Sequence, residues 1–468
     1  MTDLHWLSLA EAAALIRGGK LSPVEYAQAL IDRAERYDGL FDSFLRKTPE
    51  IALEEAKRAE AEIAGGTYRG PLHGIPYGLK DIMDYAGLPT TGHSKILIDN
   101  VAKRDATVTA KLREAGGALM GKMATHEFAL GGPSFDLPWP PARNPWNRDH
   151  FTGGSSSGSG AALAAGFLPA ALGSDTGGSV RNPASLCGIV GLKPTYGRVS
   201  RAGVLPLSYS LDNVGPMTRT VEDNALLLNV IAGYDERDPA SARVAVPDFT
   251  HDLRKGVKGL RVAVIRHFYA EDMEPHPEVG AGVEAAAKLF EDLGASVGEI
   301  RLAPLSAYAS CNRNILLSEA FAVHEKWLQE RPGDYAESTR RRLMPGAFLR
   351  AVDYVQALRL RGRLTRQFNE AMRDFDIAVT VSGMDPAAPI EDIDEVERTY
   401  PRQARNAFNV IGAPALAVPV GFTQSRLPLS MQIIGRAFDE ATVYRAAWAY
   451  EQEAGWSTQR PPIEEMAA

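Results

Sequence analysis

TGGSSSGSG at residues 152–160 and GSDTGGSVRNPAS at residues 173–185 are two loops rich in small residues, with one apolar segment between them. By composition alone, a run of glycine and serine is typical of a flexible linker. A linker, however, has no reason to be followed at once by a helix of alanine, leucine and phenylalanine. Glycines let backbone N–H groups approach a ligand, and serines supply nucleophiles or carry protons. We therefore expect both loops to belong to one chemical site.

Two other known motifs fit this part of the chain less well. Gly154, Ser156 and Gly158 satisfy the G-x-S-x-G pattern of α/β-hydrolases. That pattern requires a hydrophobic strand just before it, but NPWNRDHFT stands there, and the last histidine, His324, lies far from the C-terminus. Residues 116–122 read G-x-x-x-x-G-K, but methionine follows where a phosphate-binding loop needs a hydroxyl for magnesium. Neither a histidine-based serine hydrolase nor a nucleotide-binding protein is favoured.

The span 154–184 resembles the amidase signature family along its whole diagnostic pattern. GSSSGSGAALA is followed by A-x-G-x-D-x-G-x-S-V-R-x-P, and every fixed position is filled. GIPYGLKDI at residues 74–82 looks like the lysine segment of that family, and SLDNVGPMTRTVED at residues 210–223 is also similar. The resemblance covers most of the chain. It implies an α/β fold with a central mixed β-sheet, helices on both faces of the sheet and a helical N-terminal segment.

The resemblance carries three catalytic residues onto this sequence, namely Lys80, Ser155 and Ser179. Ser179 falls on the acylating nucleophile, and Ser155, which follows a cis peptide bond with Gly154, passes its proton to Lys80. A serine hydroxyl is inert at neutral pH unless a neighbouring group takes its proton. A lysine can do so only when its amine is neutral. We therefore expect burial to lower the pKa of Lys80.

The backbone just before the nucleophile is the expected oxyanion hole. Its N–H groups belong to Thr176, Gly177 and Gly178, together with that of Ser179. Side chains there would obstruct the hole, and small residues leave it open. Preorganised donors of this kind stabilise the transition state by about 3 to 4 kcal/mol each.

Three further residues of the loops have expected supporting roles. We expect Ser156 to orient Ser155 or Lys80. Asp175 and Arg181 are expected to brace the loops as a structural ion pair, in preference to a substrate contact by Arg181.

These features predict an amidohydrolase that acts on C–N bonds other than peptide bonds in linear amides, through a seryl acyl-enzyme. The resemblance allows a carboxylic amide, an aryl amide, a urea or a carbamate as substrate. The alternative is a glutaminase-type subunit of a transfer-RNA amidotransferase. A non-catalytic binding protein on the same scaffold is disfavoured, because all three chemical positions are retained. No metal and no cofactor is expected, since neither an HExxH motif nor a Cys/His cluster with zinc spacing occurs.

Specificity is expected to lie outside the signature. We look for the wall of the substrate pocket in the aromatic, proline-rich loop at residues 135–151 and in the region 308–405. Trp139 and Trp146 of that loop are either pocket residues or packing residues.

Residues 1–65 are expected to form a helical segment packed on the core. Ser8, Ser22 and Thr48 each stand where a helix can begin, and prolines follow Ser22 and Thr48 directly.

Residues 66–468 are expected to form a single α/β domain, with a signature core at 66–233 and a variable substrate region at about 303–405. Short apolar runs predict strands, and an amphipathic pattern between the first two predicts a β-α-β unit. The predicted strands lie at residues 259–266, 295–302, 375–382, 415–422 and 427–435, and a last helix is predicted from Asp439 to about Gly455.

Composition excludes several classes of protein. Lys plus Arg total 51 against 58 for Asp plus Glu, and the net charge of −7 comes without a dense basic block, so we expect no nucleic-acid partner. The basic run Arg340, Arg341 and Arg342 is interpreted as a solvated helix face. Cys187 and Cys311 are the only cysteines, which excludes a disulfide framework.

The chain is expected to be cytoplasmic. The N-terminus reads as an amphipathic helix without the basic start of a signal peptide, and no apolar stretch is long enough for a bilayer. The expected partners are a small amide-type substrate and water, with no membrane. Chain length and an apolar C-terminal helix allow a homodimer.

Overall fold

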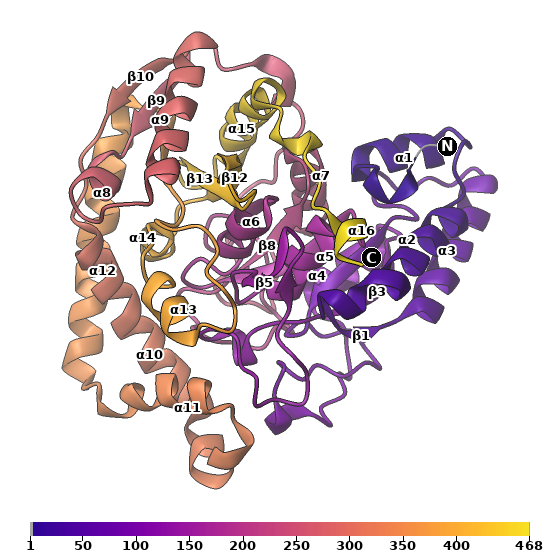
Figure 1. Cartoon of the computed structure of the whole chain (residues 1–468), viewed down its shortest axis with the longest axis horizontal. Coiled ribbons are helices and arrows are strands. Elements are labelled where there is room, and N and C mark those ends of the chain that lie inside the picture. The colour runs from indigo at the N-terminus through magenta and orange to yellow at the C-terminus, as the bar shows by residue number, and fades with distance from the viewer. Residues whose placement is uncertain (1–2, 468) are drawn as a thin grey trace.

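One mixed β-sheet runs through the molecule (Figure 1). The computed structural model describes residues 3–467. The strands are β1 (Phe44–Lys47), β2 (Pro76–Lys80), β3 (Ala118–Met123), β4 (Arg143–Asn144), β5 (Asn147–Phe151), β6 (Ala170–Asp175), β7 (Val190–Lys193), β8 (Asn213–Thr218), β9 (Arg261–Val264), β10 (Ser296–Glu299), β11 (Ile377–Val381), β12 (Ala415–Phe422) and β13 (Pro428–Gly435).

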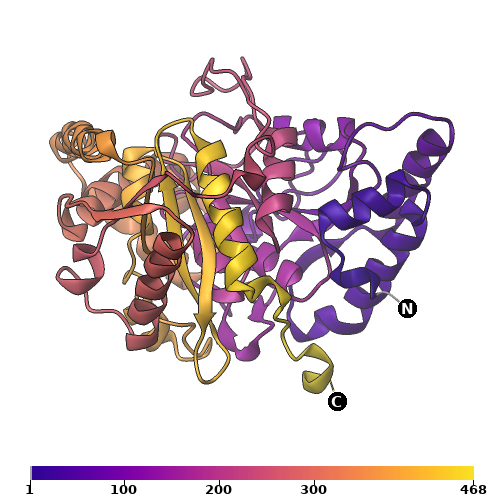
Figure 2. The same cartoon turned by 90° about the horizontal axis from the view of Figure 1, so that it is seen from above.

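The large sheet has 11 strands in the order β1-β3-β2-β6-β8-β7-β12-β13-β11-β9-β10. Strand β2 is parallel to β3 and β6, and β9 is parallel to β10 and β11. The pairs of β6 with β8 and of β12 with β13 are antiparallel. Helices lie on both sides of the sheet (Figure 2). The predicted α/β fold with a central mixed sheet is confirmed.

Sixteen α-helices surround the sheet within the described residues. They are α1 (Leu9–Arg17), α2 (Pro23–Tyr37), α3 (Pro49–Ala64), α4 (Thr107–Glu114), α5 (Ser157–Ala164), α6 (Arg181–Cys187), α7 (Val221–Ile231), α8 (His267–Ala270), α9 (Pro277–Asp292), α10 (Leu305–Glu330), α11 (Glu337–Leu343), α12 (Ala351–Ala371), α13 (Ile393–Thr399), α14 (Arg405–Ile411), α15 (Glu440–Ala454) and α16 (Ile463–Met466).

The N-terminal segment carries the three predicted helices, α1, α2 and α3. Ser8 caps α1 by accepting the N–H of Glu11, whose carboxylate accepts the N–H of Ser8 in return. Asp223 of α7 accepts the N–H groups of Leu9 and Ala10 at 3.0 and 2.9 Å, which fixes the start of α1 on the core. The segment also contains a strand that the sequence pattern does not predict. Strand β1 pairs with β3 at the edge of the sheet, and its half-exposed residues, FLRK, show no alternation of apolar and polar side chains.

The G-x-x-x-x-G-K stretch ends inside β3 and forms no phosphate-binding loop. Lys122 is buried and its Nζ lies 2.7 Å from a carboxylate oxygen of Asp81. The same Nζ donates to the carbonyl oxygen of Pro89 at 3.0 Å. A P-loop lysine must reach a phosphate from a turn between a strand and a helix, so Lys122 has a structural role instead.

The C-terminal half follows the predicted order of elements. The five predicted strands are β9, β10, β11, β12 and β13, and α9 joins β9 to the parallel strand β10 as the predicted β-α-β unit. Helices α10, α11 and α12 fill the region between β10 and β11. The basic run lies on α11, where Arg341 and Arg342 both pair with Glu397.

The last long helix, α15, is covered by its own chain. Val443, Tyr444, Ala447 and Tyr450 are buried, and the hydroxyl of Tyr444 donates to the side-chain oxygen of Asn224 at 2.8 Å. Its apolar face is therefore part of the core and gives no reason to expect a homodimer.

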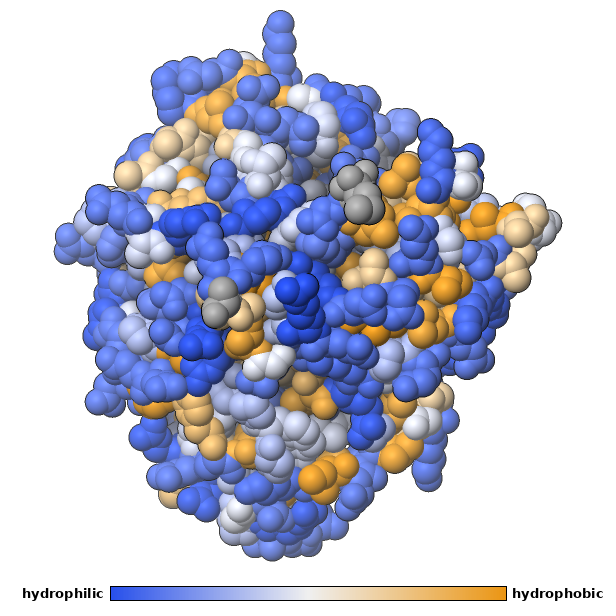
Figure 3. All heavy atoms as spheres, turned by 45° about the vertical axis from the view of Figure 1, so that its right-hand side comes forward, coloured by the Kyte–Doolittle hydropathy of each residue, from blue (hydrophilic) through white to orange (hydrophobic). Residues whose placement is uncertain are grey.

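The outer surface is mixed. The face shown in Figure 3 is mainly hydrophilic, with small apolar areas separated by polar side chains. Among residues 3–467, no helix combines the length and the apolar character needed to cross a membrane.

Candidate active site

Lys80 lies at the carboxyl end of β2, fully buried beside the end of its parallel neighbour β6. Its Nζ donates to Ser155 Oγ at 2.7 Å and to Ser174 Oγ at 2.9 Å, and both acceptors are uncharged. Burial lowers the pKa of Lys80 to about 7, although the carboxylates of Asp175 and Asp212 oppose the shift. The amine is thus partly neutral at neutral pH, which is the environment that the sequence predicts.

The loop that carries Ser155 is packed against His126. The Gly154–Ser155 peptide bond is cis, as the resemblance implies. The backbone N–H of His126 donates to the carbonyl oxygen of Ser155 at 3.0 Å. A Cβ at position 154 would lie 2.0 Å from the His126 ring, so only glycine fits there. Burial lowers the pKa of His126 to about 3, so the ring is neutral and only a weak base at neutral pH.

Asp175 and Arg181 hold the loop that carries Ser179. The guanidinium of Arg181 forms two bonds of 3.0 and 2.9 Å with the two carboxylate oxygens of Asp175, and both side chains are fully buried. The Asp175 carboxylate also accepts the N–H groups of Gly178 at 2.9 Å and Val180 at 3.2 Å. The pair is a structural ion pair, as expected, and it shapes the backbone around the nucleophile.

Arg181 also ties this loop to the C-terminal third of the chain. Its guanidinium donates to Arg405 O at 2.8 Å, to Asn409 Oδ1 at 2.7 Å and to Gln432 Oε1 at 2.8 Å. Arg405 packs directly under Gly178, where a Cβ would lie 2.8 Å from Arg405 Nε. With φ of +126°, Gly178 also has a backbone conformation that other residues rarely adopt.

The expected oxyanion hole has fewer free N–H donors than the sequence suggests. The N–H of Gly178 is not free, because it donates to Asp175. Among the backbone bonds of residues 3–467, the N–H groups of Gly177 and Ser179 have no protein acceptor. Gln403 donates to the carbonyl oxygen of Gly177 at 3.1 Å and so helps to hold this peptide unit. We therefore restrict the proposed N–H donors to those of Gly177 and Ser179. Thr176 lies next to them in the chain.

The hydroxyl of Ser179 faces Tyr400 in this structure. The backbone of the two loops is joined, since the N–H of Ser156 donates to Ser179 O at 3.2 Å. No hydrogen bond joins the hydroxyls of Ser155 and Ser179 within the described part of the chain. Instead, the hydroxyl of Ser179 interacts with the phenol of Tyr400, which makes a long bond of 3.5 Å to Gly154 O. The lysine end of the proposed relay is formed, whereas its last link, between the hydroxyls of Ser155 and Ser179, is not a hydrogen bond in this structure.

Tyr400 is a site residue that the sequence does not reveal. It follows α13, in a loop without any motif, and its only signal is its place in the variable region 303–405. Its ring lies 6.1 Å from that of Phe151 and 6.3 Å from that of His126, centroid to centroid. Burial raises the pKa of Tyr400, so its phenol stays protonated.

Ser174 is the second residue that sequence reasoning missed, although it stands inside the second loop motif. It accepts a hydrogen bond from Lys80. Ser156, expected to orient Ser155 or Lys80, acts on Ser174 instead: its hydroxyl accepts the N–H of Ser174 at 3.2 Å and donates to Ser174 O at 3.3 Å. Its contact with the lysine is thus indirect.

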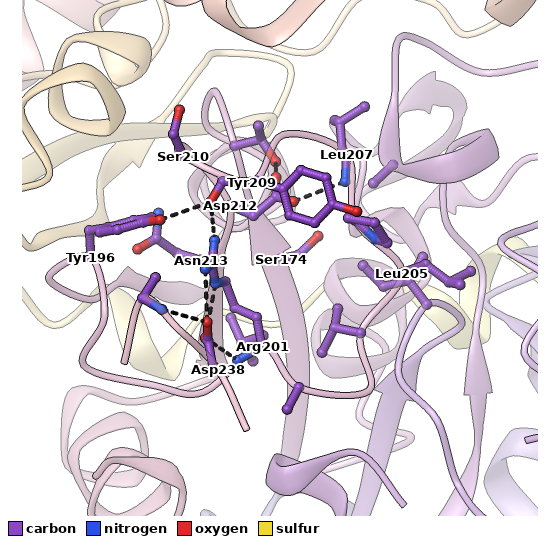
Figure 4. A pocket seen from close by; sticks show the side chains of 18 of the residues that line it. Ser174, Tyr196, Arg201, Leu205, Leu207, Tyr209, Ser210, Asp212, Asn213 and Asp238 are labelled. Carbon is purple, nitrogen blue, oxygen red and sulfur yellow. Dashed lines mark hydrogen bonds and ion pairs between the residues drawn. The ribbon is translucent and has the colours of Figure 1, made fainter. Parts of the chain in front are cut away.

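A cavity of about 610 Å³ opens beside these groups (Figure 4). Ser174 and Thr176 line it, next to Lys80 and the oxyanion loop, and most of its wall comes from residues 196–214 and 237–240. The sequence places the wall at 135–151 and 308–405, and none of the described residues that line this cavity belongs to either range. The predicted wall is not the wall of this cavity, but a smaller pocket is lined by Phe151, Tyr400 and Arg405 of the two predicted ranges, and the expectation stays a prediction.

The two tryptophans of the aromatic loop are packed against protein. Trp146 is buried and its indole N–H donates to Cys187 O at 2.8 Å. Trp139 meets the ring of His93 edge-on, at 5.6 Å between centroids. Both support the loop and neither lines the large cavity.

The side chains that could bind a metal ion are dispersed. Within residues 3–467, the histidine, cysteine, aspartate and glutamate side chains form no group of three or more that is placed to hold one. Cys187 and Cys311 are both free and buried.

Comparisons with known proteins show which sequences and structures this chain is similar to. A family model described as Amidase matches residues 25–444. A glutamyl-tRNA(Gln) amidotransferase subunit of Chloroflexus aggregans is 38% identical over 488 residues, which cover 99% of this chain and 99% of that protein. A solved structure from a vestigial protein complex, described in connection with the evolutionary origins of an s-triazine catabolic enzyme, superposes with a TM-score of 0.90 at 31% identity, over 96% of this chain and 99% of that one. A bacterial aryl acylamidase of the amidase signature family superposes with a TM-score of 0.88 at 27% identity, over 98% of this chain and 100% of the other.

Proposed function

The chain belongs to the amidase family, whose chemistry is amide hydrolysis, and we propose on that premise that it cleaves a carboxylic amide through an acyl-enzyme on Ser179. One observation carries the proposal. A fully buried lysine with a pKa of about 7 donates to Ser155, and the loop of Ser155 is bonded to that of Ser179. This arrangement supplies a base, a relay and a nucleophile without a histidine.

The proposed reaction begins when the Ser179 hydroxyl turns from Tyr400 to Ser155. Neutral Lys80 takes the Ser155 proton while Ser155 takes that of Ser179, and Ser179 Oγ bonds to the carbonyl carbon. The carbonyl oxygen becomes an oxyanion, which the free N–H groups of Gly177 and Ser179 stabilise. The proton returns through Ser155 to the leaving nitrogen as the C–N bond breaks. Water then attacks the acyl carbon and gives its proton to the same relay, which passes that proton to Ser179 Oγ as the bond between Ser179 and the acyl group breaks and the acid leaves.

The rate should rise with pH around neutrality. Only the neutral amine of Lys80 can accept a proton, and its pKa is about 7. Below that pH the ammonium form predominates, so kcat/KM is expected to fall about tenfold per pH unit. Steady-state kinetics between pH 5 and pH 9 on one amide substrate would measure this dependence of kcat/KM on pH. A profile that is flat through pH 6 to 8 contradicts the assignment of Lys80 as the base.

Tyr400→Phe should lower kcat about threefold to tenfold and leave KM nearly unchanged, since a lost hydrogen bond is worth about 1 kcal/mol. The reason is that the phenol bonds to the carbonyl oxygen of Gly154 and so helps to hold the loop of Ser155, the proposed relay. Tyr26→Phe is a matched control, because the Tyr26 hydroxyl is buried and has no partner among the described residues. Equal kinetics of the two variants would show that the phenol of Tyr400 has no role.

The second candidate function is that of a glutaminase-type subunit. It is favoured by the curated relatives named as subunits of glutamyl-tRNA(Gln) amidotransferase, of which the Chloroflexus aggregans protein matches almost the whole chain. On this observation glutamine is the first substrate to test, ahead of aryl amides, ureas and carbamates. Ammonia release from glutamine by the purified chain, and its stimulation by candidate partner proteins, would distinguish such a role from that of a stand-alone amidase.

The two candidates differ in their partners. A stand-alone amidase needs only its substrate and water. A protein of the kind named for the relatives would work in an assembly that meets transfer RNA, and the expectation of no nucleic-acid partner would then be wrong for that assembly. A cytoplasmic location fits both candidates and stays a prediction.

A further inference from the structure

The large cavity shows what kind of substrate the site can accept, provided that Ser179 attacks an amide as proposed above. Ser174 accepts a hydrogen bond from Lys80, and Thr176 precedes the free N–H of Gly177. Both line the cavity. The cavity therefore adjoins the catalytic loops at Ser174 and Thr176, although Lys80, Ser155 and Ser179 themselves do not line it. Its volume, about 610 Å³, is within the usual range for a site that encloses a ligand of drug size.

Aliphatic side chains dominate the wall of the cavity. They come mainly from the segment between Arg201 and Asn213, which crosses the middle of Figure 4. Leu205 and Leu207 project from this segment, and Val214 follows in β8. The aliphatic lining consists of Ile82, Ala129, Ala202, Val204, Leu205, Pro206, Leu207, Val214, Pro239 and Ala240.

Several charged and polar groups in the wall are bound to protein partners, whereas the buried hydroxyl of Ser210 has none among residues 3–467. The guanidinium of Arg201 forms bonds of 2.9 and 3.1 Å with the two oxygens of Asp238 (Figure 4). The hydroxyl of Tyr196 donates to Tyr209 O at 2.8 Å. These groups have little capacity left for a polar ligand.

Asp212 is satisfied in the same way. Its carboxylate accepts the hydroxyl of Thr176 at 2.6 Å and the N–H groups of Leu207 and Ser208 at 2.9 and 3.0 Å. Of the charged residues that line the cavity, Asp212 and Arg237 have no ion pair within residues 3–467, and the side chain of Arg237 is exposed.

We infer that the site takes amides with a long or bulky apolar acyl group. Apolar surface is stabilised against the aliphatic wall. Free glutamine has a charged ammonium and a charged carboxylate beside its short side chain, and it needs an anion and a cation with free capacity. The Arg201–Asp238 pair does not supply them without being broken. The aliphatic wall thus favours a hydrophobic amide, and a charged substrate such as glutamine would have to use Arg237 and Asp212, which have no ion pair among residues 3–467.

A series of primary amides tests this inference. Acetamide, butanamide, hexanamide and octanamide would be compared by ammonia release, with glutamine in parallel. We expect kcat/KM to rise by roughly threefold to fourfold for each buried methylene. If short amides or glutamine are hydrolysed and the series is flat or falls with length, the inference is wrong and the amidase activity stands. If no amide reacts, but alkyl fluorophosphonates label Ser179 faster as their chain lengthens, the inference stands and the proposed reaction fails.

Filling the cavity gives the residue-level test. Leu205→Trp should lower kcat/KM for octanamide at least about tenfold and change that for acetamide less than about twofold. Leu226→Trp is a control of the same chemistry, because Leu226 is also half-buried but lies on α7 outside the cavity. Leu205→Ala should instead move the preferred length to a longer acyl group. This second variant introduces no bulky side chain that the fold would have to accommodate. Equal losses for both amides in the Leu205 variants would overturn the assignment of this wall to the acyl group.

Discussion

Lys80→Met is expected to lower kcat by about 10³- to 10⁴-fold on any amide that the protein hydrolyses, the range associated with loss of a general base. Methionine fills a similar volume and needs no hydrogen bond, so the buried position tolerates it. The variant leaves Ser155 without the group that accepts its proton, although the oxyanion donors remain in place. The measurement is kcat at a pH well above 7, where the wild-type amine is neutral.

The chain contains a matched control for this experiment. Lys193 at the end of β7 is also fully buried, and burial lowers its pKa to about 7 as well. Its Nζ donates to Pro194 O at 2.7 Å and to no serine. Lys193→Met should retain activity within about threefold, as expected for a buried polar group outside the chemistry. A Lys80→Met variant that is as active as Lys193→Met would eliminate the proposed base.

Stability measurements give an independent readout of the same lysine. The pKa of Lys80 in the folded chain, about 7, lies below its ordinary value of 10.5. Between these values the unfolded chain binds more protons than the folded one, so the lysine makes the free energy of unfolding increase as the pH rises from 7 to 10.5. Denaturant titrations at several pH values should therefore show that the free energy of unfolding rises less between pH 7 and pH 10.5 in Lys80→Met than in the wild type.

Ser179→Ala should abolish the acyl-enzyme and lower kcat by about 10⁴- to 10⁶-fold, as for other covalent nucleophiles. Treatment of the wild-type chain with a fluorophosphonate, followed by mass spectrometry of its peptides, should find one adduct on Ser179 and none in the variant. Ser159→Ala is the control, because Ser159 is a buried serine of α5 whose hydroxyl donates to Leu172 O at 3.1 Å. An adduct on another serine would require a new assignment of the nucleophile.

Much of the arrangement is predictable because its signals are local. The capping of α1 by Ser8 can be predicted from neighbouring residues of the sequence. The apolar runs of β11, β12 and β13 are buried strands of ordinary length. The burial of Lys80 follows from the apolar residues around it in β2.

Other features depend on contacts between distant segments and have no local signal. Strand β1 exists because β3 offers it an edge, and its own residues do not alternate. Tyr400 reaches the site only because the loop after α13 folds against Phe151 and His126. The N–H of Gly178 donates to the Asp175 carboxylate, and the position of that carboxylate depends on Arg181.

The bonds of Arg181 have a consequence for synthesis of the protein. Asn409 and Gln432, which bind this guanidinium, are made more than two hundred residues after it. On the ribosome, Arg181 and Asp175 leave the exit tunnel long before these partners exist. A nascent chain that ends before Arg405 therefore lacks all the bonds that tie Arg181 to the C-terminal third, and we expect amide hydrolysis to begin only when nearly the whole polypeptide has emerged.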